Sequence, residues 1–271
     1  MSDVITDQTL DAIKQMARAA GHEHLRYHTH VVGKLKGFRD FVTDADLAAE
    51  SVVIKAIHET FPTHSIISEE GGGSTSSSEY CWFIDPLDGT KNYVWGIPLS
   101  AVSIALAFRG RVCMGVIYDP RRDEMFWGRA GHGVYLNDQR VQVGEHHRLA
   151  ESLVATDCEP ELVDLTAAMS ASIQREVASL RALGSATLAF AYVACGRLDS
   201  YFHYRLNQWD MAAGGFLLTE AGGKATDIFG GADYLNNESC LATNGFIHDE
   251  ILQVWRRNGL LDKMRAQRSS L

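Results

Sequence analysis

Asp85-Pro86-Leu87-Asp88-Gly89-Thr90 directly follows Tyr80–Ile84, an apolar run that predicts a buried strand ending in a tight turn. The turn presents two carboxylates three positions apart, followed by a glycine and a hydroxyl group. Mg²⁺ prefers oxygen ligands and commonly binds between one or two carboxylates and a substrate phosphate. Pro86 restricts the backbone between the acids, and Gly89 allows a phosphate to approach the main chain closely. The stretch therefore predicts a metal and phosphate site within one turn.

Three further acidic segments also lie at the ends of predicted elements. Asp40–Asp46 leads into a helix, Ser68-Glu69-Glu70 ends a short strand, and Trp209-Asp210 begins a helix rich in alanine and glycine. Two like charges about 4 Å apart repel by roughly 4 kcal/mol at an effective dielectric constant near 20. A convergence of these acids therefore predicts two or three divalent cations, which together can activate a water and stabilise a leaving oxygen.

Helical and strand periodicities alternate along the whole chain. The predicted helices cover 6–27, 44–61, 161–178, 185–195 and 209–221, and the predicted strands cover 65–68, 80–84, 99–108, 112–118, 180–183 and 199–203. This alternation indicates a layered α/β or α+β fold. Gly71–Ser78 is so polar and rich in glycine and serine that we expect an unpacked, flexible segment.

Bulk properties limit the classes of protein. The 271 residues are 46% hydrophobic, which suits one large domain over 1–271 with halves of about 1–150 and 151–271. The net charge of −9 disfavours general nucleic-acid binding but is compatible with a small phosphorylated substrate, because bound cations reverse the local charge. We expect a cytoplasmic protein without a membrane segment, since we find no secretory signal, no long apolar run and no Cys-x-x-Cys pair.

Five motifs in order resemble the inositol monophosphatase family of Mg²⁺-dependent, lithium-sensitive phosphomonoesterases. They are Asp40–Asp46, Ser68-Glu69-Glu70, Asp85–Thr90, Leu183-Gly184-Ser185-Ala186 and Trp209–Gly214. Their order and spacing cover nearly the whole chain. The resemblance implies the layered αβαβα sandwich of the sugar-phosphatase fold, a homodimer, and hydrolysis of a phosphate monoester by direct attack of water.

The resemblance also implies a role for each motif residue. One metal would be held by Glu69, Asp85 and the carbonyl of Leu87, a second by Asp85, Asp88 and Asp210, and a weaker third by Glu69. The catalytic set would be Asp46, Glu69 and Thr90, with Thr90 bonded to Asp46. Substrate contacts would come from Asp88, Gly89, Thr90, Gly184, Ser185 and Ala186. Glu70 and Lys36 would lie beside these residues, and Lys36 would add positive charge at the entrance.

One position departs from the inositol-preferring pattern. His203 occupies the place of a glutamate that binds substrate hydroxyls in those members, so it either contacts a different substrate or is a surface histidine. We still expect inositol 1-phosphate as the preferred substrate, although a lysine after Thr90, Lys91, is a feature that resembles the nucleotide phosphatase relatives. The alternatives are 3′-phosphoadenosine 5′-phosphate, fructose 1,6-bisphosphate, histidinol phosphate and NADP. A regulatory protein that binds the transcription machinery is the alternative from another class.

Overall fold

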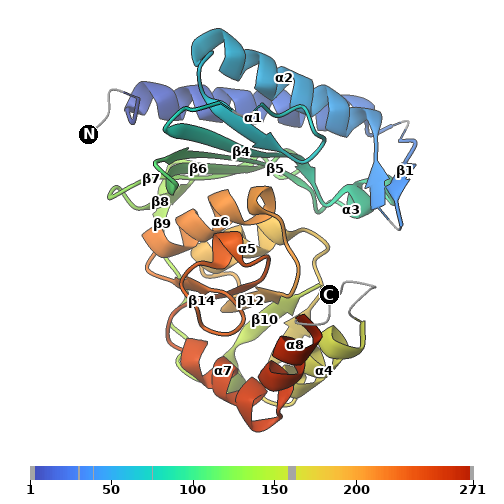
Figure 1. Ribbon diagram of the computed structural model, residues 1–271, viewed down its shortest axis with the longest axis vertical. Coiled ribbons are helices and arrows are strands. Elements are labelled where there is room, and N and C mark those ends of the chain that lie inside the picture. The colour runs from blue at the N-terminus through green and yellow to red at the C-terminus, as the bar shows by residue number, and fades with distance from the viewer. Residues whose placement is uncertain (1–3, 30, 39, 75, 158–162, 269–271) are drawn as a thin grey trace.

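Two β-sheets alternate with three layers of helices, as the computed structural model in Figure 1 shows. It describes residues 4–29, 31–38, 40–74, 76–157 and 163–268. From the top of Figure 1 downward, the helices are α1 (Asp7–Tyr27) and α2 (Asp44–Thr60) in the outer layer, α5 (Ala186–Ala194) and α6 (Gln208–Glu220) between the sheets, and α4 (Val163–Gln174), α7 (His248–Arg257) and α8 (Leu260–Arg268) in the last layer. The predicted αβαβα layering is confirmed.

The upper sheet has seven strands in the order β3-β4-β5-β6-β7-β8-β9. Strand β3 runs parallel to β4, and every other neighbouring pair is antiparallel. The strands are β3 (Ser65–Ser68), β4 (Tyr80–Asp88), β5 (Ala101–Phe108), β6 (Arg111–Asp119), β7 (Glu124–Arg129), β8 (Val134–Leu136) and β9 (Gln139–Val141). A hairpin of β1 (Lys34–Gly37) and β2 (Asp40–Val42) stands apart from this sheet, beside α3 (Thr90–Val94).

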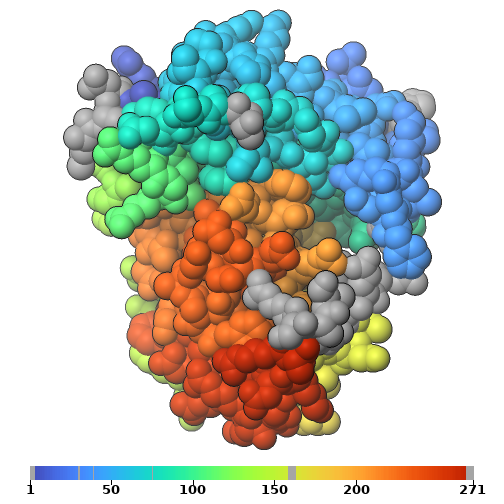
Figure 2. All heavy atoms as spheres, in the orientation of Figure 1, coloured from blue at the N-terminus to red at the C-terminus, as the bar shows by residue number. Residues whose placement is uncertain are grey.

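The lower sheet has five strands in the order β11-β10-β12-β14-β13. Strand β10 runs parallel to both β11 and β12, whereas β14 is antiparallel to its two neighbours. The strands are β10 (Leu153–Thr156), β11 (Ser179–Arg181), β12 (Ser200–His203), β13 (Lys224–Thr226) and β14 (Cys240–Thr243). In the space-filling view, the part of the chain that contains the upper sheet (blue to green) is in direct contact with the part that contains the lower sheet (mainly orange to red) (Figure 2).

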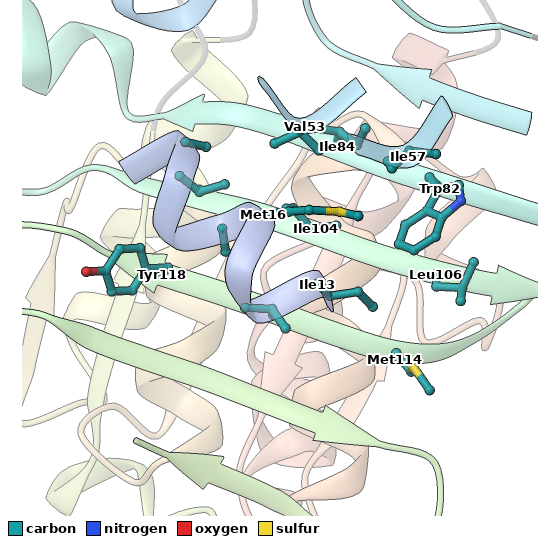
Figure 3. Packing of buried hydrophobic residues seen from close by; sticks show 14 of the residues in the cluster. Ile13, Met16, Val53, Ile57, Trp82, Ile84, Ile104, Leu106, Met114 and Tyr118 are labelled. Atoms are coloured by element: carbon teal, nitrogen blue, oxygen red, sulfur yellow. The ribbon is translucent and has the colours of Figure 1, made fainter. Parts of the chain in front are cut away.

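Helix α1 shows how the sequence pattern becomes packing. Its N-terminus is capped by the Thr6 side chain, which accepts a hydrogen bond from the Thr9 amide. The apolar positions Ile13 and Met16 are buried with side chains of the seven-stranded sheet such as Trp82 and Ile104 (Figure 3). The predicted helix at 161–178 is shorter in the structure, and positions 161 and 162 lie outside the described residues.

Strand β4 continues past the predicted end at Ile84 and reaches Asp88. Asp85 pairs with Ser103 and Asp88 pairs with Ala101, so β4 contains one more residue than β5 between these pairs. This is a β-bulge at Pro86 and Leu87. Proline is tolerated there because the hydrogen-bond ladder is already interrupted at a bulge, so no backbone N–H is needed. Both carboxylates of the turn, Asp85 and Asp88, therefore belong to β4 itself, on either side of the bulge.

The expectation that Gly71–Ser78 is unpacked is wrong for its described residues. Ser74 pairs with Ile66 of β3 in both directions, with amide-to-carbonyl distances of 2.7 and 3.0 Å. The Ser76 hydroxyl donates to the Thr63 carbonyl at 2.9 Å. Composition alone indicated a linker, but the open edge of β3 supplies backbone partners that composition cannot reveal.

Gly214 lies where α6 crosses α5, and a Cβ atom there would be 2.4 Å from the Phe190 Cβ. Glycine to alanine normally stabilises a helix interior by about 0.5–1 kcal/mol. Here we expect Gly214→Ala to lower the free energy of unfolding, because overpacking costs about 1–3 kcal/mol. Urea unfolding measures this, with Ser51→Ala on the exposed face of α2 as the control. A more stable Gly214→Ala variant would contradict the packing.

Candidate active site

The acidic turn at the end of β4 is held by its own backbone. Asp85 is 1% exposed, and its Oδ1 accepts a hydrogen bond from the Leu87 amide at 3.0 Å. Gly89 has a φ of 83°, and a Cβ atom on it would be 2.6 Å from the Leu99 carbonyl oxygen. Only glycine fits both the left-handed backbone and this close approach. Thr90 then begins α3, so the turn leads directly into a helix.

Asp46 and Asp210 are each fixed by the hydrogen bonds that begin a helix. Asp46 Oδ2 accepts from the Thr43 amide at 2.8 Å, and Asp210 Oδ2 accepts from the Asn207 amide at 2.7 Å. Both are third-position members of capping boxes, in which side chains and backbone satisfy each other. The other Asp46 oxygen lies 3.1 Å from the Thr90 hydroxyl, which is also 3.0 Å from the Leu87 carbonyl oxygen. The predicted Thr90–Asp46 pair is therefore present.

Asp88 connects the turn to the second half of the chain. Its Oδ2 accepts hydrogen bonds from the Ser185 hydroxyl, the Thr187 amide at 2.9 Å and the Thr187 hydroxyl at 2.6 Å. Its Oδ1 lies 3.3 Å from the Ala186 amide. The structure therefore brings Ser185 and Ala186 to the acidic turn. Thr187 was not among the predicted site residues, although a hydroxyl residue after Gly-Ser at a helix start is a signal for such a contact.

Lys36 joins the site from the β1–β2 hairpin. Its Nζ lies 2.9 Å from Glu69 Oε1 and 2.6 Å from Glu70 Oε1. Burial alone would lower the pKa of Lys36, but the charges of Glu69 and Glu70 outweigh burial and raise it. These distances place the predicted entrance lysine directly on both glutamates.

The remaining acids surround Asp85. Burial raises its pKa well above the usual range, and the charges of Glu69, Asp88 and Asp210 raise it further. Burial also raises the pKa of Glu69 to about 7, against the opposing charge of Lys36. Three segments that are far apart in the sequence, at Glu69, Asp85 to Asp88 and Asp210, thus place their carboxylates within mutual electrostatic reach, as their positions at element ends predicted.

The donors fit a hard divalent cation, because buried carboxylate and carbonyl oxygens are its preferred ligands and a cation would relieve their repulsion. Within the described ranges, however, no group of three acidic, histidine or cysteine side chains is already gathered as a metal shell. Asp88 faces α5, and Glu69 and Glu70 face Lys36. Side-chain rotation at Glu69 and Asp88 would therefore accompany metal binding.

Gly184 lies between two residues that the sequence did not indicate. Its amide donates to Asp157 Oδ1 at 2.8 Å. On its other side, Asn92 Nδ2 lies 2.9 Å from the carbonyl oxygen of Leu99, 2.8 Å from that of Leu183 and 3.1 Å from that of Gly184. Asn92 follows the acidic turn and Asp157 follows β10, so both halves of the chain hold this segment.

His203 is 4% exposed at the end of β12, so the alternative of a surface histidine is wrong. Its Nδ1 accepts a hydrogen bond from the Arg205 amide at 3.1 Å, which requires an unprotonated Nδ1. Burial lowers the pKa of His203 to about 4. The side chain is therefore a neutral imidazole, and its contact with substrate stays a prediction.

A layered αβαβα fold with a buried acidic turn defines a class, the phosphatases of the sugar-phosphatase fold. The model of the inositol monophosphatase family matches residues 5–260, and the chain belongs to this family of phosphatases. In the part of the chain that the structure describes, every helix is too short or too polar to cross a bilayer.

Curated relatives carry two kinds of name. A protein of Pasteurella multocida named Nus factor SuhB is 40% identical over 222 residues, covering 80% of this chain and 83% of the relative. An inositol-1-monophosphatase of Mesorhizobium japonicum is 37% identical over 261 residues, covering 92% and 96%.

Solved structures agree in fold. The extragenic suppressor protein SuhB of Bartonella henselae has a TM-score of 0.89 at 34% identity, covering 92% of this chain and 98% of that one. The inositol monophosphatase of Thermotoga maritima has a TM-score of 0.87 at 33% identity, covering 95% and 99%. The fold and the family are therefore shared with both kinds of relative.

The pKa of Asp46 predicts how kcat depends on pH. Burial raises its pKa to about 6, although hydrogen bonds from Thr43 oppose the shift. Only the ionised carboxylate accepts a proton, so kcat should fall as the pH drops through about 6. Mg²⁺ should move this fall to lower pH, because a nearby cation favours the charged form.

The measurement is kcat from about pH 5 to about pH 9 at low and saturating Mg²⁺. Asp46→Asn should remove the activity throughout this range, whereas the exposed neighbour Asp44 provides a matched control as Asp44→Asn. A fall in kcat that moves to higher pH with Mg²⁺ would contradict the role of Asp46.

Proposed function

We propose that this protein hydrolyses the phosphate monoester of a small metabolite, with inositol 1-phosphate as the preferred substrate. The observation that carries the proposal is the burial of Asp85 among the charges of Glu69, Asp88 and Asp210. Burying these charges together costs free energy unless cations neutralise them. Cations bound beside a phosphate group are what metal-dependent phosphatases use for hydrolysis. Family membership supports the same reaction class.

Two or three Mg²⁺ ions are part of the proposal. Glu69, Asp85 and the Leu87 carbonyl would hold one ion, Asp85, Asp88 and Asp210 a second, and Glu69 a weaker third. When bound, Mg²⁺ supplies Lewis-acid chemistry that lowers the pKa of water and neutralises the phosphate oxygens. Each named residue is an oxygen donor within the cluster around Asp85, which is what supports the assignment.

The protein's own residues would position the reactants and move the proton. The amides of Gly89 and Thr90, where the acidic turn leads into α3, would bind the phosphate. The Thr90 hydroxyl would accept the proton of the attacking water and pass its own to Asp46, 3.1 Å away. Glu69 would help orient that water, and Glu70 with Lys36 would set the charge beside it. We further propose that the enzyme is a homodimer.

The names of two relatives support the preferred substrate, and several rival substrates have to be tested beside it. The Mesorhizobium relative is named inositol-1-monophosphatase, and one from Thermotoga maritima is named fructose-1,6-bisphosphatase/inositol-1-monophosphatase. A Staphylococcus aureus structure described as 2′-AMP-bound has a TM-score of 0.82 at 27% identity. The rivals are fructose 1,6-bisphosphate, 3′-phosphoadenosine 5′-phosphate, histidinol phosphate and NADP.

A second candidate function is regulatory binding to the transcription machinery. It is supported by relatives named Nus factor SuhB, which are up to 40% identical to this chain. The acidic cluster favours catalysis as the primary function, because a binding surface gains nothing from a carboxylate as deeply buried as that of Asp85.

The decisive test is phosphate release across this substrate panel, with Mg²⁺ and with a chelator. We expect hydrolysis only with Mg²⁺, fastest on inositol 1-phosphate. Asp85→Asn should lower kcat at least about a hundredfold, since a neutral amide cannot balance a cation. The exposed turn residue Asp138 supplies the control as Asp138→Asn.

Two outcomes would decide against the proposal. Hydrolysis that survives Asp85→Asn or chelation would show the metal assignment to be wrong. Strong activity on one rival together with inactivity on inositol 1-phosphate would replace the preferred substrate. Folding is checked separately, because removal of a buried, repelled charge should not lower the unfolding midpoint without Mg²⁺.

A further inference from the structure

We propose that Asp157 determines substrate specificity by accepting a hydrogen bond from a hydroxyl of the substrate's organic part. The inference rests on the proposed function and names one feature of the substrate, a hydroxyl group near the phosphate. Asp157 follows β10 directly and is partly exposed, so a ligand can reach it.

The sheet places Asp157 at a ligand-binding edge. Strands β10 and β12 run parallel, with Ala155 beside Tyr201 and Thr156 beside Phe202. The next positions along the two strands are Asp157 and His203. In open sheets of this kind, ligands bind outside the carboxyl ends of the parallel strands. Asp157, directly after β10, and His203, the last residue of β12, therefore lie at the same edge of the sheet, and Gly184 and Ser185 connect Asp157 to the acidic turn.

Toward the described residues, the Asp157 carboxylate uses only part of its acceptor capacity, through the Leu183 and Gly184 amides and the Tyr201 hydroxyl. Its Oδ1 accepts the Gly184 amide at 2.8 Å, whereas the Tyr201 hydroxyl is 3.5 Å from Oδ2, at the long limit for a hydrogen bond. A carboxylate offers about four acceptor positions. Oδ2 can therefore accept a further, shorter hydrogen bond from a ligand hydroxyl.

Asp157 is also connected to the acidic turn by one short segment, Gly184 to Ala186. Asp157 binds the Gly184 amide, and Asp88 binds the Ser185 hydroxyl and the Ala186 amide. The two carboxylates thus hold consecutive residues of one segment. Burial raises the pKa of Asp157, and the charge of Asp88 raises it further. A small organic group attached to a phosphate at Gly89 would extend along this segment toward Asp157.

The neighbouring histidine cannot take this role. His203 uses Nδ1 to accept the Arg205 amide, so its remaining ring nitrogen carries the proton and can only donate. A substrate hydroxyl that needs an acceptor on this side therefore finds it at Asp157. The competing explanation is that Asp157 only holds Gly184 in place, and substrates with and without hydroxyl groups separate the two roles.

The test compares Asp157→Asn with the unchanged protein on three substrates. Inositol 1-phosphate and glycerol 2-phosphate carry hydroxyl groups, whereas phenyl phosphate carries none. Asparagine retains an acceptor for the Gly184 amide but removes the charge and replaces one oxygen with a donor. We expect KM to rise about tenfold for both polyol phosphates, the effect of losing a hydrogen bond to a charged group. For phenyl phosphate, KM and kcat should change less than about twofold.

Each other outcome counts against the inference. An equal rise in KM for phenyl phosphate would show that Asp157 acts only by holding Gly184. An unchanged KM on all three substrates would show that Asp157 does not contact the substrate. If the unchanged protein hydrolyses neither these three substrates nor any of the rivals named above, the proposed function is wrong and this inference fails with it. Asp138→Asn serves as the matched control, and the activity on phenyl phosphate reports that Asp157→Asn is folded.

Discussion

The repulsion among buried carboxylates around Asp85 is the constraint on which the rest of the structure depends. Asp85 is almost fully buried, and the charges of Glu69, Asp88 and Asp210 raise its pKa. Charges at this depth persist only where hydrogen bonds and counter-ions compensate their lost hydration. The acids come from separate strand and helix ends, so the fold has to bring these ends together and supply that compensation.

The N-termini of helices provide many of the hydrogen bonds that compensate these buried carboxylates. Asp46 and Asp210 complete capping boxes, and Asp88 accepts hydrogen bonds from the first residues of α5. The same hydrogen bonds therefore begin the helices and orient the carboxylates. One oxygen of Asp46 is engaged by its cap while the other faces Thr90. Under the proposed function, the same residues would serve both stability and chemistry, so a change to one of them would affect both.

The site lies where the two halves of the chain meet. The acidic turn and Asn92 come from the first half, whereas Gly184 and Asp157 come from the second. This division suits a phosphomonoesterase, because the phosphate end of a substrate and its organic end need different chemistry. Under the proposed function, the turn after β4 would bind the phosphate and the ends of β10 and β12 would bind the organic part.

The sequence by itself determined the family and the αβαβα layering, and it predicted the carboxylates of the candidate site, because the motifs that resemble the family are short runs of neighbouring residues. Thr43 and Asp46 show this, since a capping box needs only four consecutive positions. Tertiary structure alone decided the packing of Gly71–Ser78 on β3, the burial of His203, and the contacts of Asn92 and Asp157 with Gly184. Each of these depends on partners distant in the chain, and a hydrogen bond between distant residues has no period or spacing from which it could be predicted.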